Sequence, residues 1–174
     1  MIDKRRLINY VNSIDLKLKG YTKKINMYCV GGTALTLRDK KILSYDMDFA
    51  VSREDFRTLS GIIAEIEWKE KVRIDLMPEG EHVDYFLPHD YQRHAKKIGL
   101  FRNINLFIVS DLDILLMKAL AGRDKDYIDV KGLKRKIKSE DLLKRFEELR
   151  FKPGKKEQLK KKIDEFIKRA YSYQ

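Results

Sequence analysis

Residues 26 to 51, NMYCVGGTALTLRDKKILSYDMDFAV, constrain the fold more than any other stretch of the chain. The first apolar residues predict a short buried strand. Gly31 and Gly32 break that strand and predict a sharp turn into a short helix. A polar loop follows, and then a second strand that carries Asp46 and Asp48. This order of strand, glycine turn, helix and acidic strand is typical of an α/β protein.

Asp46 and Asp48 share one face of their strand, because successive strand side chains point to opposite faces. Met47, Phe49 and Val51 point the other way, towards a core. Two unit charges about 4 Å apart repel each other by roughly 4 kcal/mol at an effective dielectric constant of about 20. A bound cation would turn this repulsion into attraction, so the strand predicts a metal site. The alternative is an ordinary surface Asp-x-Asp.

A third carboxylate strengthens the metal interpretation. Asp75 lies on the polar face of a strand predicted for residues 67 to 77, one helical crossover after the first acidic strand. Three carboxylates at one sheet surface suit Mg²⁺, which prefers oxygen ligands. The glycine pair just upstream, with Thr33 as an added hydroxyl donor, suits a phosphate group. The alternative is that the glycine pair is only a turn.

The remaining pattern predicts an α/β fold, with a small, mixed, twisted sheet that has helices on one face and is followed by a helical C-terminal part. We expect residues 1–110 to form the core and residues 111–174 to form a helical region packed on it. Further helices are predicted over residues 3–19, 33–38, 53–66, 111–121 and 124–137, with Asp3, Ser52 and Ser110 as N-caps of the first, third and fourth. Two more helices follow: one capped by Ser139 that carries Leu142, Phe146 and Leu149, and a last one that carries Leu159, Ile163, Phe166 and Ala170. Further strands are predicted over residues 25–30, 82–87, 98–101 and 104–109, the last two as a hairpin.

The net charge of +11 is concentrated near the C-terminus, where residues 131–174 hold 16 Lys and Arg against 7 Asp and Glu. Such a basic segment favours RNA as a partner, and a charge-rich surface of a heat-adapted protein is the alternative. The single cysteine, Cys29, is consistent with a reducing compartment. No apolar run approaches the roughly 20 residues of a membrane span, and no signal peptide is recognisable, so we expect a cytoplasmic protein.

Four more residues are candidates for the site. Lys118 interrupts an apolar helix and either extends to solvent or completes the site. Asp126 and Asp129 share a helix face and are either a surface ion-pair ladder or part of the site. Arg38 follows the glycine helix and either contacts phosphate or lies on the surface.

The motifs GGTAL, DMD and RIDLM, in this order, resemble those of the nucleotidyltransferase superfamily, whose type member is DNA polymerase β. The stretch LLMKALAGRDKDYIDV, residues 115 to 130, is similar to the branch that includes nucleotidyltransferase toxins of abortive-infection toxin–antitoxin pairs. The resemblance implies transfer of a nucleoside monophosphate from an NTP to a hydroxyl acceptor. Because the tail is basic, we expect the acceptor to be RNA, such as a tRNA end. A protein hydroxyl is also an acceptor within the superfamily.

The resemblance also implies residue roles. Asp46, Asp48 and Asp75 would be catalytic and hold two Mg²⁺ ions, with Asp75 also activating the acceptor hydroxyl. The resemblance assigns nucleotide binding to Gly31, Gly32 and Lys118. From the residues themselves we add Thr33, with Arg38, Asp126 and Asp129 in support. An antitoxin-type protein would be a partner. The alternatives are a catalytically silent module that binds RNA or a partner protein, and a structural subunit whose basic helices dock an acidic partner.

Overall fold

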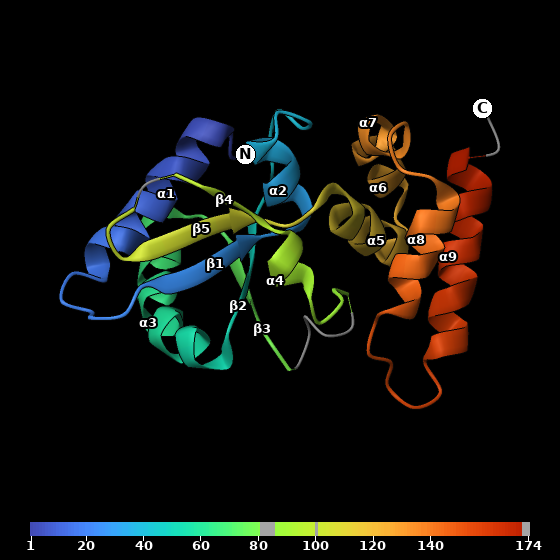
Figure 1. Cartoon of the computed structure of the whole chain (residues 1–174). Coiled ribbons are helices and arrows are strands. Elements are labelled where there is room, and N and C mark those ends of the chain that lie inside the picture. The colour runs from blue at the N-terminus through green and yellow to red at the C-terminus, as the bar shows by residue number, and fades with distance from the viewer. Residues whose placement is uncertain (81–85, 100, 172–174) are drawn as a thin grey trace.

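The computed structural model describes residues 1–80, 86–99 and 101–171, which form a five-stranded sheet and surrounding helices (Figure 1). The strands are β1 (Ile25–Cys29), β2 (Met47–Val51), β3 (Ile74–Pro78), β4 (Lys96–Ile98) and β5 (Ile104–Ile108). The helices are α1 (Lys4–Lys17), α2 (Gly31–Leu37), α3 (Arg53–Glu70), α4 (Tyr91–His94), α5 (Asp111–Ala121), α6 (Asp124–Asp129), α7 (Lys131–Lys134), α8 (Ser139–Glu147) and α9 (Lys156–Tyr171). The predicted α/β class, with helices after the sheet, is confirmed.

The sheet is mixed and has the strand order β3-β2-β1-β5-β4. β1 is antiparallel to β2 and parallel to β5, and β4 is antiparallel to β5. β2 and β3 are parallel because α3 carries the chain back between them, as a parallel connection requires. This pairing places Met47 opposite Ile74 and Asp48 opposite Asp75.

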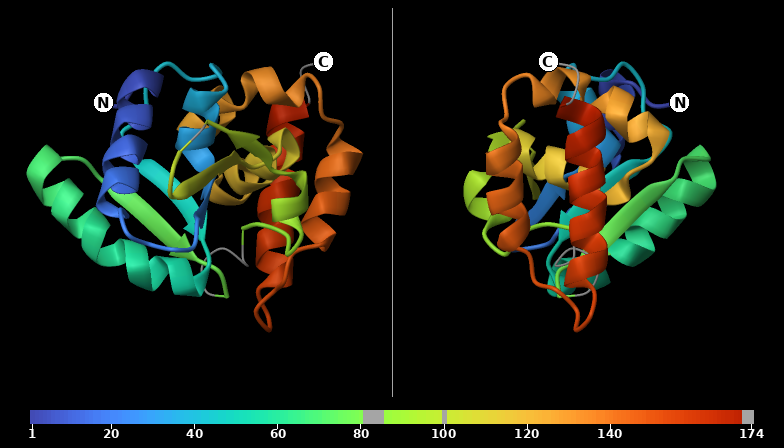
Figure 2. Two further views of the ribbon diagram at one scale, coloured as in Figure 1. Left: turned by 60° about the vertical axis from the view of Figure 1, so that its left-hand side comes forward. Right: turned by 90° about the vertical axis from the view of Figure 1, so that its right-hand side faces the viewer.

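One face of the sheet is covered by α1 and α3, which pack side by side (Figure 2). Met27, Leu106 and Phe49 belong to the inward face of the strands and have no exposed surface. Because side chains alternate along a strand, Asp48 and Asp75 point to the opposite face. Helix α4 lies on that opposite face, so a short helix flanks the second face of the sheet as well.

Tyr91 of α4 identifies this second layer. Its ring packs edge-on against Tyr28 of β1, with ring centroids 5.1 Å apart, and Tyr28 stacks on Phe107 of β5 at 4.8 Å. Aromatic pairs of this geometry add to the stability given by buried area. The second face is therefore closed by α4 next to the strands that lack the aspartates.

The predicted N-caps of three helices are confirmed. Asp3 accepts the backbone N–H of Arg6 at 2.7 Å at the start of α1. Ser52 and Ser110 accept the N–H groups three residues later, at 3.0 and 3.1 Å. Each bond satisfies a donor that the first helical turn leaves free. Ser139 is different, because it is the first residue of α8 and Lys138 is the N-cap.

Helix α5 is the centre of the C-terminal helices and packs against α2, α8 and α9. Arg145 of α8 is buried, and its guanidinium lies 2.7 Å from Asp113 of α5 and 2.7 Å from Asp90, which precedes α4. Burial alone lowers the pKa of Arg145, but Asp113, Glu148 and Asp90 raise it overall, so the group stays charged. None of the described helices is both long and apolar enough to span a membrane.

The strand predicted for residues 67 to 77 is wrong in its first half. Helix α3 continues to Glu70, and β3 begins only at Ile74. The helix stops at Lys71, which adopts a left-handed conformation with φ of 51°. Glycine is the usual residue at such a stop, so the sequence carried no obvious sign of this helix end.

Two further boundaries differ from the predictions, and one predicted strand falls largely outside the described residues. The single helix predicted for residues 124–137 is two helices, α6 and α7, which meet at Val130. The predicted hairpin is present, but its first strand is β4 rather than residues 98–101. The strand predicted for residues 82–87 falls largely on residues 81–85, which lie outside the described residues.

Candidate metal and nucleotide site

Asp46, Asp48 and Asp75 converge on one face of the sheet. One carboxylate oxygen from each residue lies within 4.8 Å of the others. Asp48 and Asp75 are opposite each other on the parallel strands β2 and β3, and Asp46 lies two residues before Asp48 on the same face. The βαβ connection thus brings together carboxylates that are far apart in sequence.

Asp48 is half-buried beside the two other carboxylates. Burial, followed by the charges of Asp46 and Asp75, raises the pKa of Asp48 to about 6, although Lys118 and the backbone N–H of Gly32 act in the opposite direction. Crowded carboxylates of this kind lower their mutual repulsion when a cation binds between them. The three oxygen donors fit a divalent ion such as Mg²⁺ in their chemistry.

Arg73 provides a positive charge next to the triad. Its guanidinium contacts both carboxylate oxygens of Asp75, with Nε 3.1 Å from Oδ1 and Nη2 3.0 Å from Oδ2. The Arg73 side chain is 71% exposed, so solvent screens this pair and the contact can open at little energetic cost. Asp75 is thus available to a competing divalent cation.

The glycine turn lies directly against Asp48. Gly31 has φ of +53°, and a Cβ atom there would lie 2.9 Å from Oδ2 of Asp48. A Cβ atom on Gly32 would lie 2.8 Å from the hydroxyl of Ser44. Both positions therefore need glycine: Gly31 for its conformation and for the approach to Asp48, and Gly32 for the approach to the following loop.

Thr33 has a different position from the one predicted. Its side chain is fully buried, and its hydroxyl accepts the backbone N–H of Asp48 at 2.7 Å. The residue was expected to bind a nucleotide directly, but the structure gives its hydroxyl a partner inside the protein. Thr33 thus fastens α2 to β2 at the residue that carries the central carboxylate.

Lys118 is buried rather than extended to solvent. Its side chain is only 6% exposed, and its Nζ lies 2.7 Å from both Asp126 and Asp129. Asp129 also lies 3.0 Å from Lys41. Asp126 has no exposed surface, so the surface ion-pair ladder considered from the sequence is wrong. The two aspartates instead hold the lysine in place.

Arg123 is a member of this network that the sequence reasoning did not include among the site residues. Its Nε lies 2.8 Å from Asp126, whose carboxylate also accepts the Arg123 backbone N–H at the start of α6. Burial raises the pKa of Asp126, but the hydrogen bonds from Arg123 and Lys118 lower it overall. One buried, ionised aspartate therefore orients two cations. The Arg-x-x-Asp spacing at a helix start was the available signal.

The two groups of residues meet in one cavity of about 180 Å³. It has the glycine turn and Asp48 on one side and the cations Lys118 and Arg123 on the other. The residues that line it are Gly31, Gly32, Asp48, Met77, Phe86, Met117, Lys118, Ala121 and Arg123. An anionic ligand that carries a divalent cation is the chemical complement of such a cavity.

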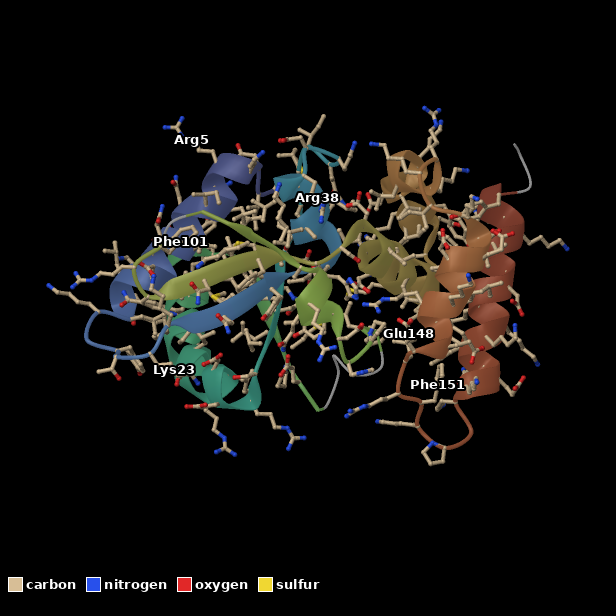
Figure 3. All side chains as sticks on the ribbon, viewed as in Figure 1. Arg5, Lys23, Arg38, Phe101, Glu148 and Phe151 are labelled. Carbon is tan, nitrogen blue, oxygen red and sulfur yellow. The ribbon has the colours of Figure 1, made fainter. Side chains whose placement is uncertain are left out.

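Arg38 does not line this cavity. Its guanidinium donates to the backbone oxygen of Val109 at 2.7 Å and lies 2.9 Å from Asp111, which ties the end of α2 to the start of α5 (Figure 3). The predicted phosphate contact is therefore not supported by its position. Arg38 contributes to the packing of the helix that follows the glycine turn.

A mixed sheet that presents three carboxylates beside a glycine turn defines a nucleotidyltransferase-like protein. A family model described as "Nucleotidyltransferase of unknown function (DUF6036)" matches residues 5–170. The match spans almost the whole chain, and the chain belongs to this family. The predicted resemblance to the nucleotidyltransferase superfamily is thereby confirmed. A comparison with curated proteins gives no match.

Proposed function

We propose that the protein is a Mg²⁺-dependent nucleotidyltransferase that moves a nucleoside monophosphate from an NTP to a hydroxyl group of RNA, such as a tRNA end. The observation that carries the proposal is the convergence of Asp46, Asp48 and Asp75 beside the glycine turn. Lys118 and Arg123 border the same cavity. The carboxylates match the metal ions of a metal–nucleotide complex, and the cations match its phosphates.

In the proposed reaction Asp46 and Asp48 would hold two Mg²⁺ ions, and Asp75 would supply a further carboxylate ligand. When bound, Mg²⁺ neutralises phosphate charge and makes the acceptor hydroxyl more acidic. Asp75, whose side chain is 37% exposed, takes the proton of that hydroxyl and passes it to water. The hydroxyl oxygen bonds to the α-phosphorus, the bond to the bridging oxygen breaks, and pyrophosphate leaves beside Lys118.

The other site residues position these groups. Gly31 and Gly32 let the triphosphate approach the backbone, and Lys118 contacts the phosphates. Asp126 and Asp129 hold Lys118 at that place, since each lies 2.7 Å from its Nζ. Thr33 acts by fixing the backbone of Asp48.

Label transfer tests the proposal. The purified protein is incubated with labelled NTPs, Mg²⁺ and total RNA, and incorporation into RNA is measured. Transfer should be lost in Asp46→Ala and Asp48→Ala and kept in Asp164→Ala, a change at an exposed carboxylate on α9. RNA binding without transfer, unchanged in the first two variants, would instead indicate a catalytically silent module. Label on protein rather than RNA would identify a protein hydroxyl as the acceptor.

We also propose that residues 1–110 form the catalytic core and that residues 111–174 carry the RNA-binding surface. The supporting observation is the excess of Lys and Arg after residue 130. Binding through phosphate contacts releases counterions, so RNA affinity should fall steeply with salt. A flat salt dependence would reject this role and favour a charge-rich surface without an RNA partner.

The similarity of residues 115–130 to nucleotidyltransferase toxins leads us to propose a cytoplasmic toxin that is countered by an antitoxin-type protein. Expression in bacteria should arrest growth, and Asp48→Ala should relieve the arrest. Coexpression of the product of a neighbouring gene tests for the partner. Unimpaired growth at equal protein levels would argue against the toxin assignment and leave the transfer reaction to be tested on its own.

A further inference from the structure

Lys41 brings a further positive charge to the candidate site. It lies in the loop between α2 and β2, and its Nζ is 3.0 Å from Oδ2 of Asp129. The same oxygen accepts a hydrogen bond from the Nζ of Lys118 at 2.7 Å. One carboxylate oxygen therefore lies between the two ammonium groups. Because Lys118 lines the cavity of about 180 Å³, the Lys41 ammonium lies at the edge of that cavity.

The two glycines of the turn approach different partners. A Cβ atom on Gly31 would lie 2.9 Å from Oδ2 of Asp48, whereas a Cβ atom on Gly32 would lie 4.0 Å from Nζ of Lys41. Asp48 belongs to the carboxylate triad, so the turn leads from the triad to the lysine within two residues. A metal-bound phosphate chain that follows the turn away from the triad would meet Lys41.

Lys41 is not needed to balance the two aspartates of the lysine network. Asp126 pairs with Arg123 at 2.8 Å. Asp129 pairs with Lys118 at 2.7 Å. Lys41 adds a third cation to these two acids, so the network keeps one positive charge in excess. A charge that is partly withdrawn from water is stabilised by an opposite charge. In the proposed function Mg²⁺ neutralises the triad, which leaves a phosphate as the partner of this excess charge.

The loop holds Lys41 in position without burying it. On one side of Lys41, the backbone N–H of Lys40 donates to the oxygen of Leu35 at 2.9 Å. On the other side, Ile2 and Ser44 exchange two backbone hydrogen bonds of 2.7 and 2.8 Å. The Lys41 side chain is 21% exposed and also borders a separate cavity of about 330 Å³. Its ammonium group is thus placed before a ligand arrives and is open to one.

We propose that Lys41 is a further substrate-binding residue, which contacts the two phosphates of the NTP that leave as pyrophosphate. The proposal rests on the proposed function, in which the α-phosphorus lies at the triad. A phosphate oxygen at the edge of the cavity accepts hydrogen bonds from Lys41 and Lys118 together, in the way that Oδ2 of Asp129 does. Such charge-assisted bonds are about twice as strong as neutral ones. Lys41 therefore favours triphosphates over monophosphates.

The test measures phosphate binding without turnover. Calorimetric titrations with inorganic tripolyphosphate and Mg²⁺ compare the wild-type protein with Lys41→Met, Lys41→Arg and Lys40→Met. Lys41→Met should bind tripolyphosphate about tenfold more weakly, because it loses a hydrogen bond between charged groups. Lys41→Arg keeps the charge and should lose much less. Lys40→Met is the matched control, since it removes the same charge from the exposed neighbouring residue.

Two further measurements separate phosphate binding from a structural role. A Mn²⁺ titration without phosphate reports on the carboxylate triad, and Lys41→Met should bind Mn²⁺ as tightly as the wild-type protein. Lys41→Met is also made in an Asp129→Asn background, where Lys41 has lost its charged partner. The loss of tripolyphosphate affinity should persist there, because the contact with phosphate does not pass through Asp129.

The outcomes separate this inference from the proposed function. Equal tripolyphosphate affinity of wild type and Lys41→Met, or an equal loss in Lys40→Met, overturns the inference and leaves the nucleotidyltransferase proposal standing. A loss of Mn²⁺ affinity in Lys41→Met, or an effect that disappears in the Asp129→Asn background, shows a structural role and also overturns it. Label transfer to RNA decides the proposed function separately. Tripolyphosphate binding that depends on Lys41, without any transfer, would reject the reaction and leave the phosphate contact of Lys41 in place.

Discussion

Asp48 and Asp75 lie opposite each other on two parallel strands, so the register of β2 and β3 alone places their carboxylates side by side. A shift of one residue in either strand would turn one carboxylate into the core. The pairing of β2 with β3 therefore positions these two carboxylates. The surrounding residues, Lys118 and Gly32 among them, then modify the pKa of Asp48.

The Asp48→Asn variant is expected to be more stable than the wild-type protein near neutral pH in the absence of metal. The pKa of Asp48 is raised to about 6 in the folded state, so the folded state binds this proton more tightly than the unfolded state. Protonated Asp48 therefore contributes to the free energy of unfolding at low pH, and this contribution is lost as pH rises from about 4 through about 6. The expected gain in the free energy of unfolding is about 2 kcal/mol, measured by urea denaturation.

The control for this prediction is Asp164→Asn, at a carboxylate that is 54% exposed. It should show no comparable gain. Mg²⁺ should raise the stability of the wild-type protein and have little effect on Asp48→Asn, because only the folded triad binds the ion. Identical pH profiles for wild type and Asp48→Asn would contradict the crowding of the three carboxylates.

Gly31→Ala should lower both stability and metal affinity. The substitution forces a Cβ atom into a backbone conformation with φ of +53° and to 2.9 Å from Asp48. Gly154→Ala is the matched control, because its φ is +74° but its Cβ atom would meet no atom within 4 Å. Both variants should lose about 1 kcal/mol of stability to backbone strain. Gly31→Ala should lose about 1–2 kcal/mol more than Gly154→Ala, because only its Cβ atom comes close to Asp48.

Thr33→Val is expected to destabilise the protein by about 1–3 kcal/mol, since the Asp48 N–H would be left buried without its acceptor. Thr33→Ser keeps the hydroxyl and should lose less. Denaturant unfolding measures stability, and a Mn²⁺ titration measures whether Asp48 is still correctly placed. If Thr33→Ser and Thr33→Val behave alike in both assays, the hydroxyl does not fasten β2.

Lys118→Met should destabilise the protein by about 2–4 kcal/mol, because it leaves two aspartates without their shared buried partner. Arg123 and Lys41 remain beside those aspartates and limit the loss. Unfolding of Lys118→Met, Asp126→Asn and the double variant gives the coupling energy, and Asp126→Asn should restore part of the stability that Lys118→Met loses. Lys125→Met, at an exposed position of α6, serves as the control; an equal loss there would refute the buried pairing.

Local patterns were sufficient to predict the centre of the site. Strand alternation places Asp46 and Asp48 on one face, and a crossover helix brings a parallel strand with Asp75 beside them. These relations depend on periods of two residues and on chain connectivity, which a sequence displays directly. The helix start at Ser110 was predictable for the same reason, since a cap acts within one turn.

Contacts between distant segments were not predictable in this way. The burial of Lys118 depends on how α6 folds back onto α5, and the partner of Thr33 depends on how α2 meets β2. The end of α3 at Lys71 was missed because a non-glycine residue adopts the left-handed conformation there. Such features follow from tertiary packing, which overrides local preference.

The buried guanidinium of Arg145 makes the C-terminal helices indispensable to the sheet that precedes them. A fragment that ends before α8 would remove the Arg145 guanidinium that lies 2.7 Å from Asp113, a carboxylate with no exposed surface in the whole chain. Attempts to isolate the catalytic half by truncation should therefore yield an insoluble or unfolded product, and domain-swapped chimaeras must carry α8 along with α5.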